Sequence, residues 1–270
     1  MRHCGVLGDP IEHSLSPVLH RAGYAALGLD WSYDAHRVSS GGLREFLAGL
    51  DGSWRGLSLT MPLKREAMAL VDEASELAEL GGAANTLLLG EGVVRGDNTD
   101  IPGAEAALRE RYAGPVGHAA ILGGGATAAS TLLALARQGC RSFVLHVRDA
   151  ARAAETLAAA ERFGGLEVSI APLDVAPEGD LLVSTIPATA QTPDLVAGCA
   201  RVPVLFEVLY DPWPTPLAAS AGDRVLVRGL DLLVHQAALQ FEQFTELPAP
   251  LLEMRQAGEA ALRERLDEGT

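Results

Sequence analysis

The sequence predicts a two-domain α/β protein, and three of its features support that prediction. Its 270 residues are enough for two hydrophobic cores and too few for more. Short apolar runs alternate with helix-like segments in two successive series, a pattern typical of mostly parallel sheets covered by helices. A helical tail follows the second series. We therefore expect residues 1–101 and 236–270 to form one domain, with residues 102–235 inserted as the other.

The first series starts with a strand and a polar loop, followed by a helix with Pro17 near its start, where the missing N–H of proline costs nothing. The predicted strands are Cys4–Leu7, Ser32–Arg37, Gly56–Leu59, Thr86–Leu89 and Val93–Arg95. The predicted helices are Pro17–Leu27, Leu43–Leu50, Lys64–Val71 and Ser75–Leu80. The last two strands are joined by the turn Gly90-Glu91-Gly92.

The second series follows a predicted helix at Gly103–Tyr112 and a Gly-Pro pair at 114–115 that punctuates the chain. Its predicted strands are His118–Leu122, Ser142–Val147, Glu167–Ile170, Leu181–Ser184, Val204–Glu207 and Val225–Val227, and a helix is predicted at Thr127–Gln138. The tail from Leu230 to Glu268 is predicted to be helical, with an interruption at Leu247–Pro250. Its helices are expected to return to the first domain.

Composition argues against several classes of protein. The net charge of −14 disfavours a nucleic-acid partner, which would call for a basic stripe. No uninterrupted apolar run approaches the roughly 20 residues that span a bilayer, so no membrane association is expected. The N-terminus lacks the apolar segment of a signal peptide, which favours the cytoplasm. The scattered cysteines Cys4, Cys140 and Cys199 suggest small apolar residues rather than a disulfide framework or a metal site. Monomer and homodimer both stay open.

One compositional detail concerns chemistry. Of the 21 basic residues, Lys64 is the single lysine and the rest are arginines. A guanidinium holds its proton too tightly to give it up, whereas an ammonium can be tuned to titrate. Lys64 is therefore a candidate proton donor, and compositional chance is the competing explanation.

A glycine-rich turn lies between the first strand and the first helix of the second series. Gly123 permits a tight turn, Gly125 lets the backbone approach a pyrophosphate, and the helix start offers N–H groups and a favourable dipole. Gly124, Ala126 and Thr127 complete the turn. A glycine-rich turn alone is weak support, but its place between strand and helix predicts a Rossmann dinucleotide-binding domain.

The next strand bears on the choice of cofactor. NAD-binding units usually carry an acidic residue near its end, which accepts hydrogen bonds from the ribose 2′-hydroxyl. Here Val147 is followed by Arg148, with Arg152 close behind, and planar guanidinium groups match the oxygens of a 2′-phosphate. The alternatives are that both arginines are solvated residues at a helix start, or that Asp149 serves NAD. We favour NADP over NAD.

Three polar clusters follow strands of the first series, where ligands bind in open α/β sheets. They are residues 14–17, residues 59–64, and residues 85–86 together with 96–100. Their hydroxyls, amide, ammonium and carboxylate suit a small polyhydroxylated ligand. Taken singly, Ser14 and Ser16 can be turn or cap residues, Thr60 can precede a helix, and Asp100 can cap the next helix.

The segments GDPIEHSLSP, TMPLK, ANTL, GDNTD, YDPWPTPL and GLDLLVHQA occur in this order and resemble the shikimate dehydrogenase family from Gly5 to about Pro250. The resemblance implies reversible NADPH-dependent reduction of 3-dehydroshikimate to shikimate, in the biosynthesis of chorismate and aromatic amino acids. It implies Lys64 and Asp100 as the catalytic pair. It implies that shikimate is bound by Ser14, Ser16, Thr60, Asn85, Asp100, Tyr210 and Gln236. It implies a cofactor site, without metal, formed by Glu76, Gly123, Gly124, Gly125, Ala126, Thr127, Val147, Arg148, Asp149, Arg152, Val208 and Gly229.

The sequence departs from the family pattern at three places. Ser58 stands where many members have asparagine, Ala126 where glycine is usual, and Val147-Arg148-Asp149 where an Asn-Arg-Thr segment is common. The last two leave the NADP preference open to question. The competing hypotheses are a quinate/shikimate or aminoshikimate dehydrogenase that uses NAD, and a non-catalytic domain that senses a dinucleotide and a metabolite.

Overall fold

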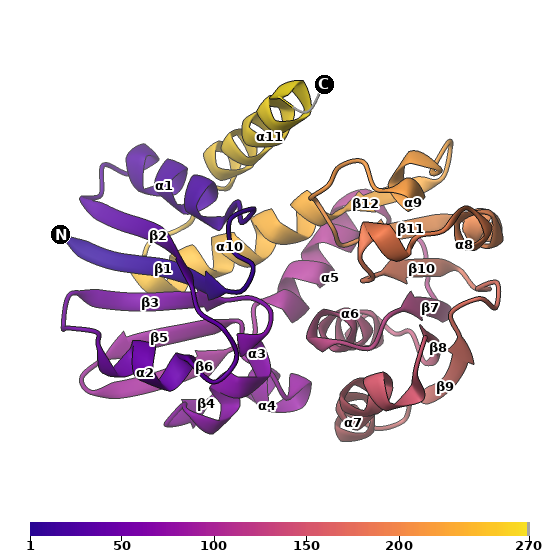
Figure 1. Cartoon of the computed structure of the whole chain (residues 1–270), viewed down its shortest axis with the longest axis horizontal. Helices are drawn as coiled ribbons and strands as arrows, with labels where there is room; N and C mark the ends of the chain where they lie inside the picture. Colours follow the sequence, from indigo (N-terminus) through magenta and orange to yellow (C-terminus); the bar gives the residue numbers. More distant parts are fainter. Residues whose placement is uncertain (269–270) are drawn as a thin grey trace. The chain divides into compact units, whose positions relative to one another are not determined.

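The computed structural model describes residues 1–268 of the chain (Figure 1). The chain divides into two compact units, Met1–Thr99 with Leu233–Thr270, and Asp100–Leu232. The C-terminal segment is therefore grouped with the N-terminal one. The unit boundaries fall two residues before the expected position 101 and three before position 236.

The first unit contains a mixed six-stranded sheet. Its strands are β1 (Arg2–Gly8), β2 (Trp31–Arg37), β3 (Trp54–Leu59), β4 (Glu73–Ala74), β5 (Thr86–Gly90) and β6 (Val93–Asp97), in the order β2-β1-β3-β5-β6-β4. β1 is parallel to β2 and β3, whereas β5 is antiparallel to both β3 and β6. The hairpin of β5 and β6 pairs Thr86 with Asp97, so the residues just outside the pair, Asn85 and Asn98, come to the same end of the sheet.

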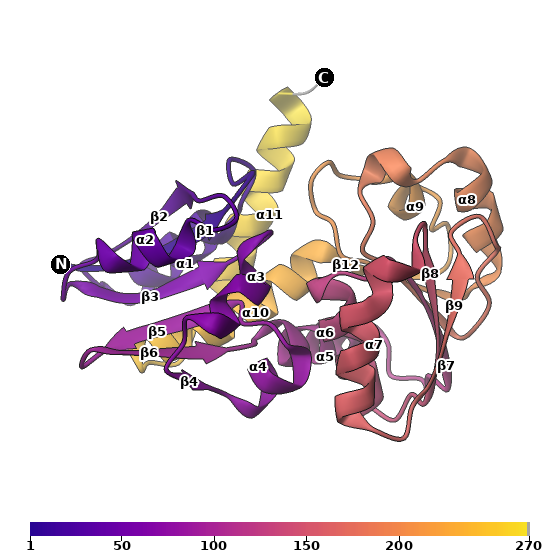
Figure 2. The ribbon, with the colours of Figure 1, turned by 60° about the horizontal axis from the view of Figure 1, so that its bottom comes forward.

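Helices cover both faces of this sheet (Figures 1 and 2). They are α1 (Ser16–Ala26), α2 (Leu43–Ala48), α3 (Leu63–Glu66), α4 (Glu76–Gly81), α11 (Leu251–Glu268) and the later part of α10 (Gly229–Thr245). Because side chains alternate along a strand, Leu57 and Leu59 of β3 enter the core cluster that α2, α3 and α4 cover. Gly56 and Ser58 face α10 instead: a Cβ on Gly56 would lie 2.1 Å from the Phe244 ring.

The second unit contains a six-stranded sheet in which every strand is parallel to its neighbours. Its strands are β7 (His118–Leu122), β8 (Ser142–Val147), β9 (Glu167–Pro172), β10 (Leu181–Ser184), β11 (Val204–Glu207) and β12 (Val225–Arg228), in the order β12-β11-β10-β7-β8-β9. Counted within this unit, the order is 6-5-4-1-2-3, the doubly wound arrangement of dinucleotide-binding domains. The strand order reverses between β7 and β10, where such folds bind ligands.

The helices of the second unit pack on the two faces of its sheet (Figure 2). They are α5 (Asp100–Arg111), α6 (Ala126–Arg137), α7 (Ala154–Phe163), α8 (Pro193–Gly198), α9 (Pro216–Ala219) and the first residues of α10, with a 3₁₀ turn at Ala150–Ala153. Alanines predominate in α6, and its residues 128–136 are all buried. Cys140 and Cys199 are buried here, and Cys4 is buried in the first unit, which confirms their role as small core residues.

Two helix predictions need correction. The helix predicted at Lys64–Val71 is an α-helix only over Leu63–Glu66 and continues as a 3₁₀ turn at Ala67–Ala69. It stops because the next residues pair with β6, where the Asp72 N–H donates to the Val94 carbonyl at 2.8 Å. The helix predicted to start at Gly103 starts at Asp100, so Asp100 lies inside its first turn rather than before it. Among residues 1–268, no helix is long and apolar enough to cross a membrane.

Candidate active site

The loop that follows β1 carries the two predicted serines of the first unit. Ser14 Oγ accepts a hydrogen bond from the N–H of Ser16 at 3.3 Å, so Ser14 does form the turn that precedes α1. Asp9 fixes the other end of the loop, since its carboxylate accepts from Arg37 Nε at 2.8 Å and also from Ser39. The loop is therefore held at both ends, with Ser14 half-buried and Ser16 buried.

Thr60 and Lys64 follow β3 on consecutive turns of the chain. Thr60 closes the turn into α3, because its carbonyl accepts from the Leu63 N–H at 2.9 Å. Lys64 lies half-buried in α3, and its carbonyl accepts from the N–H of Ala84 at 2.8 Å. That bond places the Lys64 backbone directly beside the segment that leads into Asn85.

Asn85 joins three segments of the first unit that are distant in sequence. Its Oδ1 accepts from the backbone N–H of Thr99 at 2.8 Å, and its Nδ2 donates to Thr99 Oγ1 at 2.9 Å. Nδ2 also lies 3.3 Å from Gln236 Oε1 on α10. All three residues are buried. Asn85 and Gln236, predicted separately from the sequence, therefore meet in one polar site.

Two of the residues predicted to bind substrate belong to the second unit. Asp100 is the first residue of α5 and is buried, with 6% of its surface exposed. It directly follows Thr99 in the chain. Tyr210 is half-buried in the segment after β11. Glu76, predicted near the cofactor, is an exposed residue of the first turn of α4 in the first unit.

The glycine-rich turn lies at the point where the strand order of the second sheet reverses. Gly123 has a φ of +110°, and a Cβ there would lie 2.2 Å from Thr185 Oγ1 at the end of β10. A Cβ on Gly124 would lie 2.6 Å from the carbonyl oxygen of Arg152, whereas a Cβ on Gly125 would meet nothing within 4 Å. The first two glycines are thus required by packing within the protein. Gly125 faces open space, as the close approach of a pyrophosphate requires.

The start of α6 offers an anion the groups that a dinucleotide phosphate needs. Gly125 is the N-cap residue of this twelve-residue helix and provides no side-chain hydrogen bond to its first turn. No acidic side chain lies in that first turn. The N-terminal N–H groups and the helix dipole therefore favour a negative charge at this end.

The segment after β8 carries the side chains expected to select the cofactor. Arg148 and Arg152 are both exposed. Asp149 Oδ1 accepts from the N–H of Ala151 at 3.0 Å and caps the 3₁₀ turn Ala150–Ala153. One carboxylate oxygen of Asp149 is thus engaged in a local turn, while both guanidinium groups reach the surface. This arrangement fits a 2′-phosphate better than a 2′-hydroxyl.

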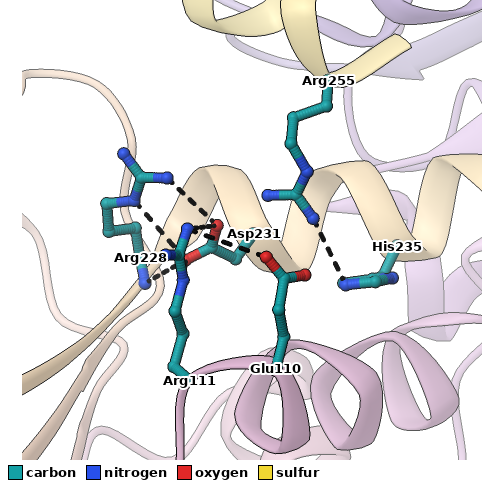
Figure 3. A network of polar contacts seen from close by, with 6 residues as sticks. All are labelled: Glu110, Arg111, Arg228, Asp231, His235 and Arg255. Carbon is teal, nitrogen blue, oxygen red and sulfur yellow. Dashed lines mark hydrogen bonds and ion pairs between the residues drawn. The ribbon is translucent and has the colours of Figure 1, made fainter. Parts of the chain in front are cut away.

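Val208 and Gly229 lie against each other in the second unit. A Cβ on Gly229 would lie 2.4 Å from the Val208 carbonyl oxygen, so a side chain at 229 would displace the segment after β11. Asp231, two residues further along α10, is fully buried and accepts from Arg111 Nη2 at 2.7 Å and from the Arg228 N–H at 3.0 Å (Figure 3). Burial raises the pKa of Asp231, but the hydrogen bonds of the two arginines outweigh it and hold the pKa at about 2. The start of α10 is therefore anchored beside Val208.

A buried carboxylate that was not predicted from the sequence lies immediately before Val208. Glu207 has no exposed surface, and it accepts hydrogen bonds from Gln191 Nε2 at 2.8 Å, Thr215 Oγ1 at 2.9 Å and the Leu209 N–H at 3.1 Å. Burial raises its pKa, and these hydrogen bonds offset only part of that effect. Glu207 joins the two ends of the segment 208–215. Its signal in the sequence was an acidic residue within the apolar run VLFEVLY.

A second missed group lies under the Asn85 site. Gln240 of α10, buried four residues after Gln236, bonds to the Asn85 backbone, Thr86 and Ser58. The spacing of four residues placed it on the same face of the helix as Gln236, which is the signal that could have found it.

Within residues 1–268, no cluster of His, Cys, Asp and Glu side chains could hold a metal ion.

The second unit has a glycine-rich turn at the switch point of a doubly wound sheet, and the first unit has a site rich in amides and hydroxyls. This combination is typical of dinucleotide-dependent oxidoreductases. The profile of the shikimate dehydrogenase substrate binding domain matches residues 6–87, and that of the shikimate 5′-dehydrogenase C-terminal domain matches residues 229–257. The shikimate dehydrogenase (NADP(+)) of Caulobacter vibrioides is 34% identical over 267 residues, which cover 93% of this chain and 92% of that protein. The chain belongs to the shikimate dehydrogenase family.

The same region occurs within a longer relative. The pentafunctional AROM polypeptide of Saccharomyces cerevisiae is 34% identical over 267 residues, which cover 91% of this chain but 17% of that polypeptide. The chain thus spans about a sixth of the AROM relative and nearly all of the Caulobacter enzyme.

Solved structures agree with this assignment. The shikimate dehydrogenase of Mycobacterium tuberculosis superimposes with a TM-score of 0.87 at 39% identity, covering 96% of this chain and 100% of that one. The Thermus thermophilus enzyme, solved with NADP(H) and shikimate, gives 0.85 at 33% identity over 97% and 100%. Quinate dehydrogenase of Corynebacterium glutamicum, solved with NAD, gives 0.86 at 26% identity over 96% and 99%.

Proposed function

We propose that this protein is an NADP-dependent shikimate dehydrogenase, which reversibly reduces 3-dehydroshikimate to shikimate in the biosynthesis of chorismate and aromatic amino acids. The observation that carries the proposal is the polar site of the first unit, where Asn85 and Gln236 meet beside the backbone of Lys64. Membership of the shikimate dehydrogenase family supports the same activity. We further propose a cytoplasmic enzyme that acts as a monomer or a homodimer on this small-molecule substrate.

The cofactor site belongs to the second unit. Bound NADPH supplies the hydride that reduces the 3-keto carbon. The turn from Gly123 to Thr127 would hold the pyrophosphate at the start of α6, and the open space beside Gly125 supports this assignment. Arg148 and Arg152 would bind the 2′-phosphate, with Val147 and Asp149 forming the rest of that segment. Val208, Gly229 and Glu76 would contribute to the nicotinamide part of the site.

Lys64 supplies the proton. Reduction places negative charge on the oxygen of the 3-keto group, and the Lys64 ammonium would donate a proton to that oxygen. In the oxidation of shikimate the neutral amine takes the proton back. Asp100 would act with Lys64 as the catalytic pair, its carboxylate accepting a hydrogen bond from a substrate hydroxyl. General acid–base help of this kind contributes about 10²- to 10⁴-fold to the rate.

The remaining residues bind and orient the ring. Ser14 and Ser16 in the loop after β1, Thr60 before α3, and Asn85, Tyr210 and Gln236 bind the hydroxyl and carboxylate groups of shikimate. A site built from hydrogen-bonding groups rejects ligands that lack the matching hydroxyl, because its own buried polar groups would then be left unpaired.

The variant Lys64→Arg tests the proton-transfer role, because it keeps the positive charge and removes a titratable ammonium. We expect kcat for shikimate oxidation to fall by at least 10²-fold, with KM changed by less than about threefold. Lys64→Ala should lose several orders of magnitude in kcat. Near-normal turnover of either variant would rule out Lys64 as the proton donor.

A quinate dehydrogenase that uses NAD is the second candidate. The free carboxylate oxygen of Asp149 and the similarity to the Corynebacterium quinate dehydrogenase favour it. Steady-state rates with shikimate and quinate, each with NADP⁺ and NAD⁺, separate the two candidates. If none of these substrate and cofactor pairs changed the absorbance at the nicotinamide band, the protein would instead be a non-catalytic sensing domain.

A further inference from the structure

A chain of buried hydrogen bonds leads from β2 to Asn85 in the first unit. Tyr33 Oη lies 2.5 Å from Ser58 Oγ, and Ser58 Oγ lies 2.7 Å from Gln240 Oε1. Gln240 Nε2 lies 2.9 Å from Thr86 Oγ1, which in turn lies 2.9 Å from Asn85 Oδ1. All five side chains are buried. We call these five residues the buried relay.

The backbone determines the direction of every bond in the buried relay. The Thr99 N–H can only donate, and it lies 2.8 Å from one of the two terminal atoms of the Asn85 side-chain amide, so that atom is the oxygen Oδ1. The backbone carbonyl of Asn85 can only accept, and it lies 3.0 Å from one of the two terminal atoms of the Gln240 amide, so that atom is the nitrogen Nε2.

The hydroxyls follow from these two assignments. Thr86 accepts from Gln240 and therefore donates to Asn85 Oδ1. The other terminal atom of the Gln240 amide is therefore the oxygen Oε1, so the Ser58 hydroxyl donates to it and accepts from the Tyr33 hydroxyl. With Oδ1 accepting from the Thr99 N–H and from Thr86, Asn85 directs its NH₂ group toward Gln236 Oε1 and Thr99 Oγ1.

Ser58 is the middle hydroxyl between Tyr33 and Gln240 in the buried relay. Here a short hydroxyl both accepts and donates, which lets it join the Tyr33 phenol to the Gln240 oxygen. Asparagine cannot play this part with one atom, since its oxygen only accepts and its nitrogen only donates. The serine hydroxyl is therefore the group that allows a single atom to connect the Tyr33 phenol to the Gln240 oxygen.

We propose that Gln240 is a positioning residue, which through Thr86 and the Asn85 carbonyl fixes the orientation of the Asn85 amide, and with it the Asn85–Gln236 pair, in the proposed substrate site. This inference rests on the proposed function, since it assigns a role to a residue of the substrate site. Gln240 lies beneath Asn85 and acts on the ligand only through it. Its loss should therefore weaken substrate binding and leave cofactor binding, which belongs to the other unit, unchanged.

The variant Gln240→Met tests the proposal, because methionine fills a similar volume without hydrogen bonds. We expect KM for shikimate to rise about tenfold, which corresponds to about 1.4 kcal/mol. We expect kcat to stay within about threefold and KM for NADP⁺ to stay unchanged, since the chemistry and the second unit are not altered. Tyr33→Phe removes only the first hydroxyl of the relay and should give a smaller rise, of about threefold.

Gln243→Met is the matched control. It lies on the same helix, and its amide donates to Asp97 Oδ2 at 2.5 Å rather than to the buried relay. We expect it to leave KM for shikimate unchanged. Thermal unfolding of each variant shows whether a change reflects loss of fold, and the dissociation constant for shikimate, measured by calorimetry, gives a second readout of binding.

Three outcomes would overturn the inference. KM for shikimate unchanged in Gln240→Met would show that Asn85 needs no support from below. Equal increases in both KM values, or an equal effect of Gln243→Met, would show general loosening of the fold. A wild-type protein that does not oxidise shikimate with NADP⁺ would overturn the proposed function, and this inference with it.

Discussion

His20 should make the stability of this protein depend on pH. Its imidazole is fully buried in α1, stacked on the Tyr33 ring with 4.1 Å between centroids and surrounded by Tyr24, Phe241 and Phe244. Burial lowers the pKa of His20 from 6.5 to about 3, and the neighbouring Gln240 side chain offsets only part of this effect. The folded protein therefore holds this imidazole neutral at pH values where the unfolded chain protonates it.

The sign and the size of the effect follow from proton linkage. Between pH 6.5 and pH 3 the unfolded chain binds one more proton than the folded one, so stability rises with pH and is lost as pH falls. Each unit of pH within that window is worth about 1.36 kcal/mol, so His20 should cost about 2.5 kcal/mol between pH 7 and pH 4.5. That is a substantial fraction of the roughly 5–15 kcal/mol by which domains are typically stable.

The assay is urea unfolding at pH 7 and pH 4.5 for the wild type, His20→Phe and Phe241→Leu. His20→Phe keeps an aromatic ring on Tyr33 and removes the titratable group, so its loss on acidification should be smaller by about 2.5 kcal/mol. Phe241→Leu disturbs the same core but keeps the imidazole, so it should lower both values equally. The reasoning is refuted if the wild type and His20→Phe lose the same stability on acidification.

Three further predictions concern the second unit. Gly125→Ala should leave the melting temperature unchanged, because its Cβ would meet nothing within 4 Å, but it should raise KM for NADP⁺ about tenfold. Gly229→Ala should instead destabilise the fold by about 1–3 kcal/mol, because its Cβ would lie 2.4 Å from a backbone oxygen. Replacing Arg148 and Arg152 together by glutamine should weaken the binding of NADP⁺ by at least about tenfold and leave the binding of NAD⁺ unaffected. Equal losses of affinity for both cofactors would contradict a role in binding the 2′-phosphate. Glu207→Gln replaces one hydrogen-bond acceptor by a donor, although all three partners of Glu207 donate. It should therefore lower the free energy of unfolding in urea at pH 7 by about 1–3 kcal/mol and raise KM for NADP⁺. Unchanged values would show that the segment 208–215 does not depend on this carboxylate.

Buried parallel strands were the most predictable part of the fold. The predicted bounds of β7, β8, β10 and β11 agree with the structure, because strands buried on both faces are continuous apolar runs that end at turns. The edge strand β9 extends to Pro172, beyond the predicted end at Ile170, because its exposed residues carry no such pattern. Helix ends were less predictable, since α3 ends where a distant strand, β6, takes over the backbone hydrogen bonds.

The candidate site divides in the same way. Motifs that depend on local geometry, such as the turn at Gly123–Gly125, could be located from neighbouring residues alone. The spacing of four residues from Gln236 could point to Gln240, but its partners Asn85 and Ser58 could not be found in this way, because they lie more than 150 residues away in the chain. The role of each predicted substrate and cofactor residue stays a prediction for the variants described above.

The β5–β6 hairpin has a practical consequence for handling the protein. Its turn, at Glu91 and Gly92, is exposed and adopts positive φ angles of 55° and 77°, while Asn85 and Thr99 flank the opposite ends of the strands. Five residues of strand span about 16 Å, which separates the turn from the polar site by the length of the hairpin. A fluorophore, an affinity tag or a surface linkage inserted between Glu91 and Gly92 would therefore report on the enzyme, or immobilise it, without touching the groups that recognise its ligand.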